Sequence, residues 1–153
     1  MVKTLLNPRD QEEILARLQR IHVDSARQWG KMSAHQMICH VSDAFKLYMG
    51  LLAVAPPGFP YPSKILKFGS LGMPMRWPKG FRTPREIDQH AKGAPTGEFA
   101  GDVDELKGLV ERFTRKPQDF EWPSHPYLGR MSEKEWMRLG YLHTDHHLRQ
   151  FGA

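Results

Sequence analysis

Three histidines fall within five positions in YLHTDHHLRQF, residues 141–151 of the sequence. On a helix, His143 and His147 lie one turn apart, so their imidazoles point toward the same side. Imidazole is a ligand for zinc, nickel, copper and iron. The pair is therefore either part of a metal site or a polar helix end that is rich in histidine, and a third ligand is needed to make it a site.

His40 is the candidate for that third ligand. It lies on the apolar face of a predicted helix that begins after Ser33, where a buried imidazole needs a polar partner. Three converging imidazoles would repel one another if protonated, whereas one divalent ion satisfies all three in their neutral form. Three histidines also leave a coordination position open, as a catalytic metal site requires. The alternative for His40 is an ordinary core histidine.

His146 is the candidate catalytic residue beside these ligands. At about 100° per residue, His143 and His147 lie about 40° apart around the last helix, and His146 lies about 60° from His143. Periodicity does not exclude His146 as a ligand, but we predict that it transfers protons or orients a neighbouring group. Its alternative role is a capping or surface imidazole. Arg149 and Gln150 are expected to orient the same region.

The other residues with metal-binding or nucleophilic side chains are assigned simpler roles. His125 is expected in a turn, with a place on a pocket wall as the alternative. Cys39 is expected as a small core side chain, because it lies about 100° around the helix from His40. It is the only cysteine, which excludes an internal disulfide and a cysteine-pair zinc site. The histidines expected on the surface or in loops are His22, His35 and His90.

Four amphipathic helices must position these residues. Their N-terminal signals are Asn7 before Pro8, Ser33 with Gln36, Asp102, and Ser132 with Glu135. With the apolar positions that follow, they predict helices at roughly 8–21, 34–51, 103–115 and 133–147. We therefore expect residues 1–153 to form one all-α domain, a four-helix bundle.

A connection of about fifty residues separates the second and third helices, against ~2–8 in most bundles. It permits the second and fourth helices to run antiparallel, which brings His40 to His143 and His147. We expect a short helix at residues 63–68 and a helix N-cap at Thr83. We also expect the aromatic residues to pack onto the bundle, namely Phe59, Tyr61, Phe68, Trp77 and Phe81.

The same connection is strongly basic, with six positively charged residues and no Asp or Glu between residues 56 and 85. The six are Lys64, Lys67, Arg76, Lys79, Arg82 and Arg85. If the connection flanks the metal, these charges favour an anionic substrate. The alternatives are a solvated basic face and a nucleic-acid-binding segment.

Two stretches of the sequence resemble a known superfamily. WGKMSAHQMICHV, residues 29–41, and HTDHHLRQF resemble the DinB/YfiT-like superfamily of metal-dependent four-helix-bundle proteins. HPYLGRMSEKEWMRLGYLHTDHHLRQFG resembles an uncharacterised bacterial branch of it, a domain-of-unknown-function family. The resemblance covers nearly the whole chain. It implies an up-down-down-up bundle and zinc or nickel bound by His40, His143 and His147. Characterised relatives are transferases and isomerases that use low-molecular-weight thiols such as bacillithiol or mycothiol.

These observations predict a metal-dependent enzyme, a hydrolase or a thiol-dependent transferase. The ion would lower the pKa of a bound water or thiol. The expected partners are a small-molecule substrate, an anion or a thiol, and a second copy of the chain in a homodimer. The alternative function is a non-catalytic binding or stress-related module stabilised by metal, with nucleic-acid binding third. The sequence has no signal-peptide core and no apolar run that could span a bilayer, so we expect a cytoplasmic protein with no membrane partner.

Overall fold

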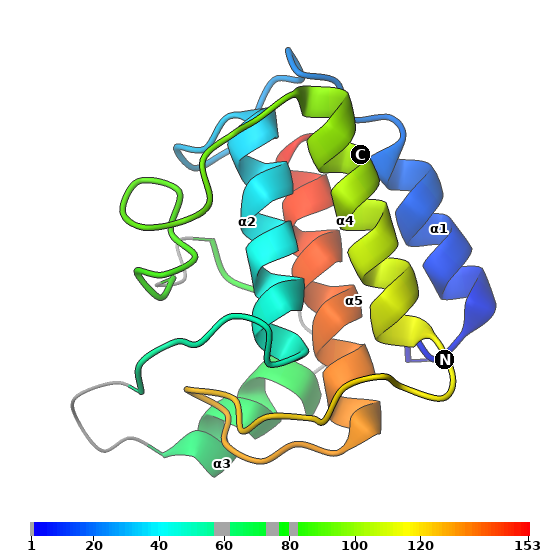
Figure 1. The fold of residues 1–153 in the computed structure, drawn as a ribbon, viewed down its shortest axis with the longest axis vertical. Helices are drawn as coiled ribbons and strands as arrows, with labels where there is room; N and C mark the ends of the chain where they lie inside the picture. Colours follow the sequence, from blue (N-terminus) through cyan, green and yellow to red (C-terminus); the bar gives the residue numbers. More distant parts are fainter. Residues whose placement is uncertain (1, 57–61, 73–76, 80–82) are drawn as a thin grey trace.

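The computed structural model describes residues 2–56, 62–72, 77–79 and 83–153, and over these residues it contains helices and no β-strand. Four long helices lie side by side (Figure 1). They are α1 (Pro8–Leu18), α2 (Ala34–Tyr48), α4 (Phe99–Thr114) and α5 (Glu133–Gln150). The short helix α3 (Ser63–Lys67) leads into a π-helical turn, η1 (Phe68–Gly72). The all-α prediction is confirmed for the described residues.

The helices that carry the candidate ligands begin at the predicted signals. Ser33 and Gln36 form a complete capping box at the start of α2, and Ser132 and Glu135 form one at the start of α5. At α1, the side chain of Asn7 accepts from the backbone of the first turn, as predicted. These caps satisfy backbone N–H groups that a helix leaves without internal partners, and so they fix where each helix begins.

Four local predictions are wrong. The N-cap of α4 is Glu98, whose carboxylate accepts from the N–H groups of Ala100 and Gly101, so Asp102 lies inside the helix. Helix α1 ends at Leu18 rather than near residue 21, and α2 ends at Tyr48 rather than near residue 51. Thr83 precedes a turn at residues 85–87 and does not cap a helix. The longer side chain of Glu98 reaches the first turn from one residue before the helix, which leaves the Asp102 carboxylate for other contacts.

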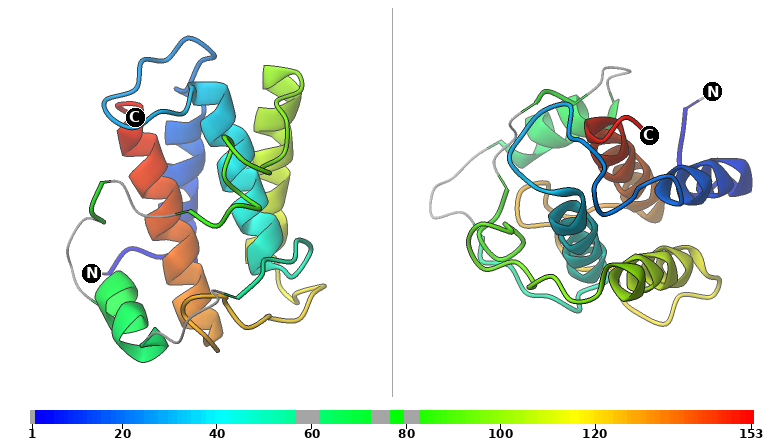
Figure 2. Two further views of the ribbon diagram at one scale, coloured as in Figure 1. Left: turned by 90° about the vertical axis from the view of Figure 1, so that its left-hand side faces the viewer. Right: turned by 90° about the horizontal axis from the view of Figure 1, so that it is seen from above.

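The long helices run in two directions, with α1 and α5 upward and α2 and α4 downward in Figure 1. Hydrogen bonds agree for α1 and α5: Leu5 N–H donates to Met137 O near the start of α5, and Arg17 donates to Ala153 O beyond its end. In the right panel of Figure 2 the four helices surround a shared interior. The first half of α2 therefore faces the second half of α5.

Gly140 lets α5 approach its neighbours closely. A Cβ atom at this position would lie 2.9 Å from Leu5 Cδ1 and 3.1 Å from Phe113 Cε1, closer than side chains normally pack. Both of these neighbours are completely buried. This close approach lies one turn before His143 on α5.

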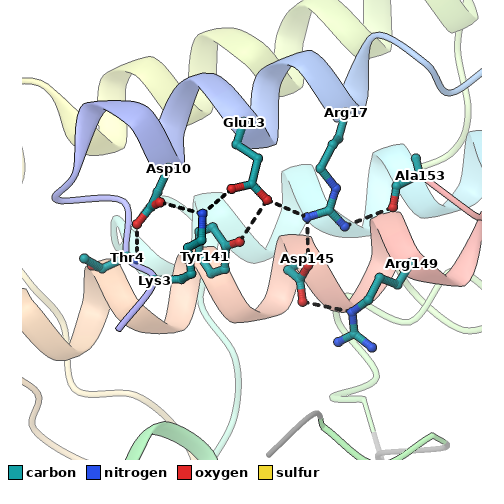
Figure 3. A network of polar contacts seen from close by, with 9 residues as sticks. All are labelled: Lys3, Thr4, Asp10, Glu13, Arg17, Tyr141, Asp145, Arg149 and Ala153. Carbon is teal, nitrogen blue, oxygen red and sulfur yellow. Dashed lines mark hydrogen bonds and ion pairs between the residues drawn. The ribbon is translucent and has the colours of Figure 1, made fainter. Parts of the chain in front are cut away.

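Polar side chains join α1 to α5 (Figure 3). Arg17 donates to Asp145 Oδ1 at 2.7 Å, and Arg149 donates to the other oxygen of the same carboxylate at 2.9 Å. Tyr141 adds a hydrogen bond to Glu13. Asp145 lies between the candidate ligands in sequence, but its contacts belong to the α1–α5 interface.

The connection between α2 and α4 contacts the helices at several described points. Lys67 forms an ion pair with Glu135 and donates to Arg130 O, which places α3 beside the start of α5. Trp77 is partly buried against the core, as expected, whereas Phe68 is 71% exposed, so its predicted burial is wrong. The expectations for Phe59, Tyr61, Arg76, Phe81 and Arg82 lie outside the described residues.

None of the helices in the described part of the chain has both the length and the apolar composition needed to cross a membrane.

Candidate metal centre

The imidazoles of His40, His143 and His147 converge between α2 and α5. The Nε2 atom of His143 lies 3.2 Å from Nε2 of His40 and 3.1 Å from Nε2 of His147. His40 and His147 are buried, and His143 is partly exposed. The three form one of the groups of side chains, among the described residues, that could hold a metal ion. The structure thus brings together the three side chains that the sequence predicted as ligands.

Each of the three imidazoles has a partner at its other ring nitrogen. Those partners, at 2.7–2.8 Å, are Ile87 O for His40, the Tyr48 hydroxyl for His143, and Gln150 Oε1 for His147. When each neutral ring carries its proton on Nδ1, the Nδ1–H group donates to the oxygen partner. The lone pair of Nε2 then faces the centre of the cluster. Partners of this kind fix the orientation of histidines that bind metals.

Burial keeps the three imidazoles neutral. Desolvation lowers the pKa of His40 and holds the pKa values of His143 and His147 well below the ordinary value of 6.5. For His143, the neighbouring histidines lower the pKa further. Metals bind neutral imidazole, so near pH 7 these side chains need to lose no proton before ligation.

The spacing of the three nitrogens fits a single ion. With Zn–N bonds of about 2.0–2.1 Å and tetrahedral angles, two ligand nitrogens lie about 3.3 Å apart. The observed separations of 3.1 and 3.2 Å are close to this value. Hydrogen bonds cannot satisfy three lone pairs that point at one another, so a cation at the centre is the arrangement that suits these atoms.

His146 lies beside the cluster and does not join it. It is buried, and its ring contacts the rings of Trp29, Trp77 and His147 at centroid distances of 5.8, 6.2 and 5.2 Å. Its Nδ1 atom is buried without a hydrogen-bond partner. Its alternative role as a surface imidazole is wrong, because the side chain is enclosed by aromatic rings.

Arg149 and Gln150 separate in the structure. The Gln150 side chain accepts from His147 and donates to Trp29 O at 2.9 Å, so it joins a ligand to the segment before α2. Arg149 instead binds Asp145 on the α1–α5 side (Figure 3). Only Gln150 takes the orienting position that the sequence suggested for both.

The remaining histidines lie apart from the cluster. His125 has the expected turn role, since its Nδ1 accepts from the N–H groups of Tyr127 and Leu128. His22 and His90 are exposed. His35 was assigned to the surface or a loop, but it lies in the first turn of α2 with Nε2 2.6 Å from Asp102 Oδ2. The loop assignment is therefore wrong, while the side chain is partly exposed.

The connection between α2 and α4 forms part of the surroundings of the cluster. The Trp77 ring lies 5.8 Å from the His143 ring, and the ammonium group of Lys79 lies 4.7 Å from the ring centre of Trp29. Arg85 is exposed, while Arg76 and Arg82 lie outside the described residues. One of the basic residues therefore stands next to an aromatic ring that contacts His146.

Two residues beside the ligands were not assigned to the site from the sequence. Tyr48 lies among the buried apolar residues of α2, yet its hydroxyl binds His143. Ile87 contributes a backbone carbonyl, for which a sequence gives no signal. The signal available for Tyr48 was its hydroxyl, since a buried tyrosine usually needs a hydrogen-bond partner.

The sequence profile of one family, described as "Protein of unknown function (DUF1569)", matches residues 70–153, which is more than half of the chain. The chain belongs to the DUF1569 family. The DUF1569 match includes His143, His146 and His147, whereas His40 and Tyr48 lie before it. No curated protein and no solved structure matches the chain significantly.

Proposed function

We propose that this protein is a metal-dependent enzyme in which His40, His143 and His147 hold one divalent ion, zinc or nickel. The observation that carries the proposal is the convergence of three buried or partly buried Nε2 atoms, each on a ring whose Nδ1 has an oxygen partner. A structural zinc site normally has four protein ligands, and three leave room for an exchangeable ligand. Imidazoles alone do not separate zinc from nickel.

We also propose that the fold is the four-helix bundle of the DinB/YfiT-like superfamily, with up-down-down-up topology. The resemblance of residues 29–41 and of HTDHHLRQF supports this relation. So do the opposite directions of α2 and α5. The DUF1569 family adds no activity of its own, so the reaction class rests on the site.

A bound divalent ion supplies Lewis acidity, which lowers the pKa of a water molecule or a low-molecular-weight thiol. Residues of the chain would orient the ligands, limit the access of water and transfer protons. Ile87, Tyr48 and Gln150 orient the three ligand rings. Trp77 and Trp29 limit the access of water beside His143 and His146. His146, with one buried ring nitrogen lacking a partner, carries a proton between the reacting group and solvent.

The substrate is proposed to be a small anionic molecule or a thiol. Lys79, whose ammonium group lies over Trp29, supports this class because it places a positive charge beside the rings around His146. Once a turnover assay exists, Lys79→Met should raise KM and weaken its salt dependence. Lys64→Met, at an exposed position of α3, serves as the matched control and should change neither quantity.

Metal analysis of the purified protein tests the site. The three-histidine site of the wild-type protein should hold about one ion per chain. The His40→Ala and His147→Ala variants should lose this ion. His90→Ala removes an exposed imidazole and should retain the metal of the wild type. Equal metal content in all four proteins would contradict the proposal.

A panel of hydrolase and thiol-transferase substrates tests the enzyme. Metal-replete wild type should turn over at least one class, and His146→Asn should lower kcat without lowering metal content. If no substrate is turned over while chelation still lowers Tm, the site is a structural link between α2 and α5. That outcome would establish the non-catalytic alternative.

Nucleic-acid binding by residues 56–85 stays a prediction. Lys67 already pairs with Glu135, and Lys79 packs over Trp29. An oligonucleotide shift assay at low and high salt checks it, because phosphate contacts give a steep salt dependence.

A further inference from the structure

A second group of side chains that could hold a metal ion lies where the first turns of α2 and α4 meet. His35 and Cys39 are one turn apart on α2, and Asp102 reaches them from the first turn of α4. Asp102 Oδ2 lies 2.6 Å from His35 Nε2 and 3.5 Å from Cys39 Sγ. One nitrogen, one sulfur and one oxygen thus come within 4.8 Å of one another.

This arrangement arises from three residues that the sequence assigned to other roles. Glu98 caps α4, which frees Asp102 to turn toward α2. His35 lies in a helix rather than in a loop, and the Cys39 thiol points at a carboxylate rather than into purely apolar surroundings. His35 and Cys39 face α4, on a different side of α2 from His40, which faces α5.

We propose that His35, Cys39 and Asp102 form a second metal site, for a borderline-soft divalent cation such as zinc, which joins the first turns of α2 and α4. Imidazole, thiolate and carboxylate are the three ligand types that zinc uses in proteins. The ion would bind the lone pair of His35 Nε2, an oxygen of Asp102 and the Cys39 sulfur, whose proton passes to solvent.

The distances are compatible with this ligation. Metal–ligand bonds of about 2.0–2.3 Å in a tetrahedral site separate ligand atoms by about 3.3–3.6 Å. The Cys39–Asp102 distance already has this value, and the His35–Asp102 pair must open by less than about 1 Å. Both of the latter side chains are partly exposed, so they can make this adjustment and admit an ion.

The surrounding charges favour a cation. Asp102 is ionised, because the N–H of Gly97 donates to Oδ2 at 2.8 Å and lowers the pKa of the carboxyl, with a further contribution from His35. The nearby carboxylates of Asp43 and Glu105 add negative potential at the thiol.

Cobalt(II) spectroscopy under reducing, anaerobic conditions tests the proposal. Because Cys39 is the only cysteine, a near-ultraviolet thiolate-to-cobalt charge-transfer band can arise only from this position. Wild type titrated with two equivalents of Co²⁺ should show that band and bind two ions per chain. Cys39→Ser keeps a donor to Asp102 but removes the thiolate, so it should lose the band and bind one ion. Asp102→Ala should weaken the band.

The test separates this site from the three-histidine centre. His40→Ala removes a ligand of that centre only, so the thiolate band should persist in this variant. Far-ultraviolet circular dichroism verifies that each variant is folded. The proposal is overturned if wild type shows no thiolate band at two equivalents, or if the band survives Cys39→Ser or is unchanged by Asp102→Ala.

Discussion

His40 Nδ1 lies 2.8 Å from the carbonyl oxygen of Ile87, so the backbone of the connection between α2 and α4 holds an imidazole of α2 in place. A carbonyl only accepts, so the ring is protonated at Nδ1 and its Nε2 lone pair is directed at the other histidines. The same stretch of the connection is held by Asp43, one turn after His40, whose buried carboxylate accepts from Ala94 N–H at 2.8 Å.

Asp43→Ala should therefore act on the candidate metal site from a distance. Loss of the bond to Ala94 and of the contact from Gln89 frees the chain around Ile87. We expect metal affinity to fall about tenfold or more and stability to fall by about 1–3 kcal/mol. Competition with a chromophoric chelator and thermal unfolding measure the two effects. Asp104→Ala, at an exposed position of α4, is the control that should change neither.

Tyr48→Phe should weaken metal binding without changing packing. The phenyl ring fills the same volume, but His143 loses its partner at Nδ1. We expect an affinity loss of about 10-fold to 100-fold, measured by the same chelator competition. Tyr141→Phe removes the hydroxyl that contacts Glu13 on the α1–α5 side and provides the matched comparison. If both variants bind metal as tightly as wild type, the hydroxyl of Tyr48 has no role at the site.

The sequence predicted the elements that depend on local signals. Each of the two capping boxes, and the spacing of His143 and His147, depends on only a few neighbouring residues of the sequence. The structure contains both capping boxes and places the two histidines side by side. The partner of His40 could not be predicted, because it is a backbone oxygen brought near by the path of a long connection. The error at Asp102 has a similar cause. Both Glu98 and Asp102 are acidic residues that could cap the start of α4, and in the structure the Glu98 side chain makes the capping hydrogen bonds.

His125 should make the metal-free protein sensitive to acid. Burial lowers its pKa to about 4 in the folded protein, against 6.5 as the ordinary value. The unfolded chain therefore binds the proton first, so stability present above pH 6.5 is lost as the pH falls toward 4. This one residue can account for at most about 3 kcal/mol of that loss.

His125→Asn tests this dependence. An asparagine can accept from the N–H groups of Tyr127 and Leu128 as histidine does, but it does not titrate. Denaturant unfolding at several pH values should show a shallower loss of stability below pH 6.5 in the variant. Identical pH profiles for the two proteins would contradict the assignment.

Asp145→Asn should lower stability and leave metal binding intact. Asp145 lies two residues from each of the candidate ligands His143 and His147. Its carboxylate nevertheless pairs with Arg17 and Arg149 at the contact between α1 and α5 (Figure 3). We expect a loss of about 1–2 kcal/mol, since these ion pairs are largely shielded from solvent. Chemical denaturation measures it, and chelator competition should give the wild-type affinity. A large fall in affinity would show that the interface also positions the ligands.

The aromatic rings around the histidines give the protein an optical property of its own. Trp77 contacts His143, Trp29 contacts His146, and Trp136 reaches the cluster through Tyr48. Trp122 stacks on Trp136 and extends the chain of rings toward the edge of the fold. All four tryptophans of the chain thus lie within one to three side-chain contacts of the candidate ligands. A paramagnetic ion bound by the candidate ligands would quench this tryptophan fluorescence. The native tryptophans therefore report, without any added label, whether the metal site is occupied.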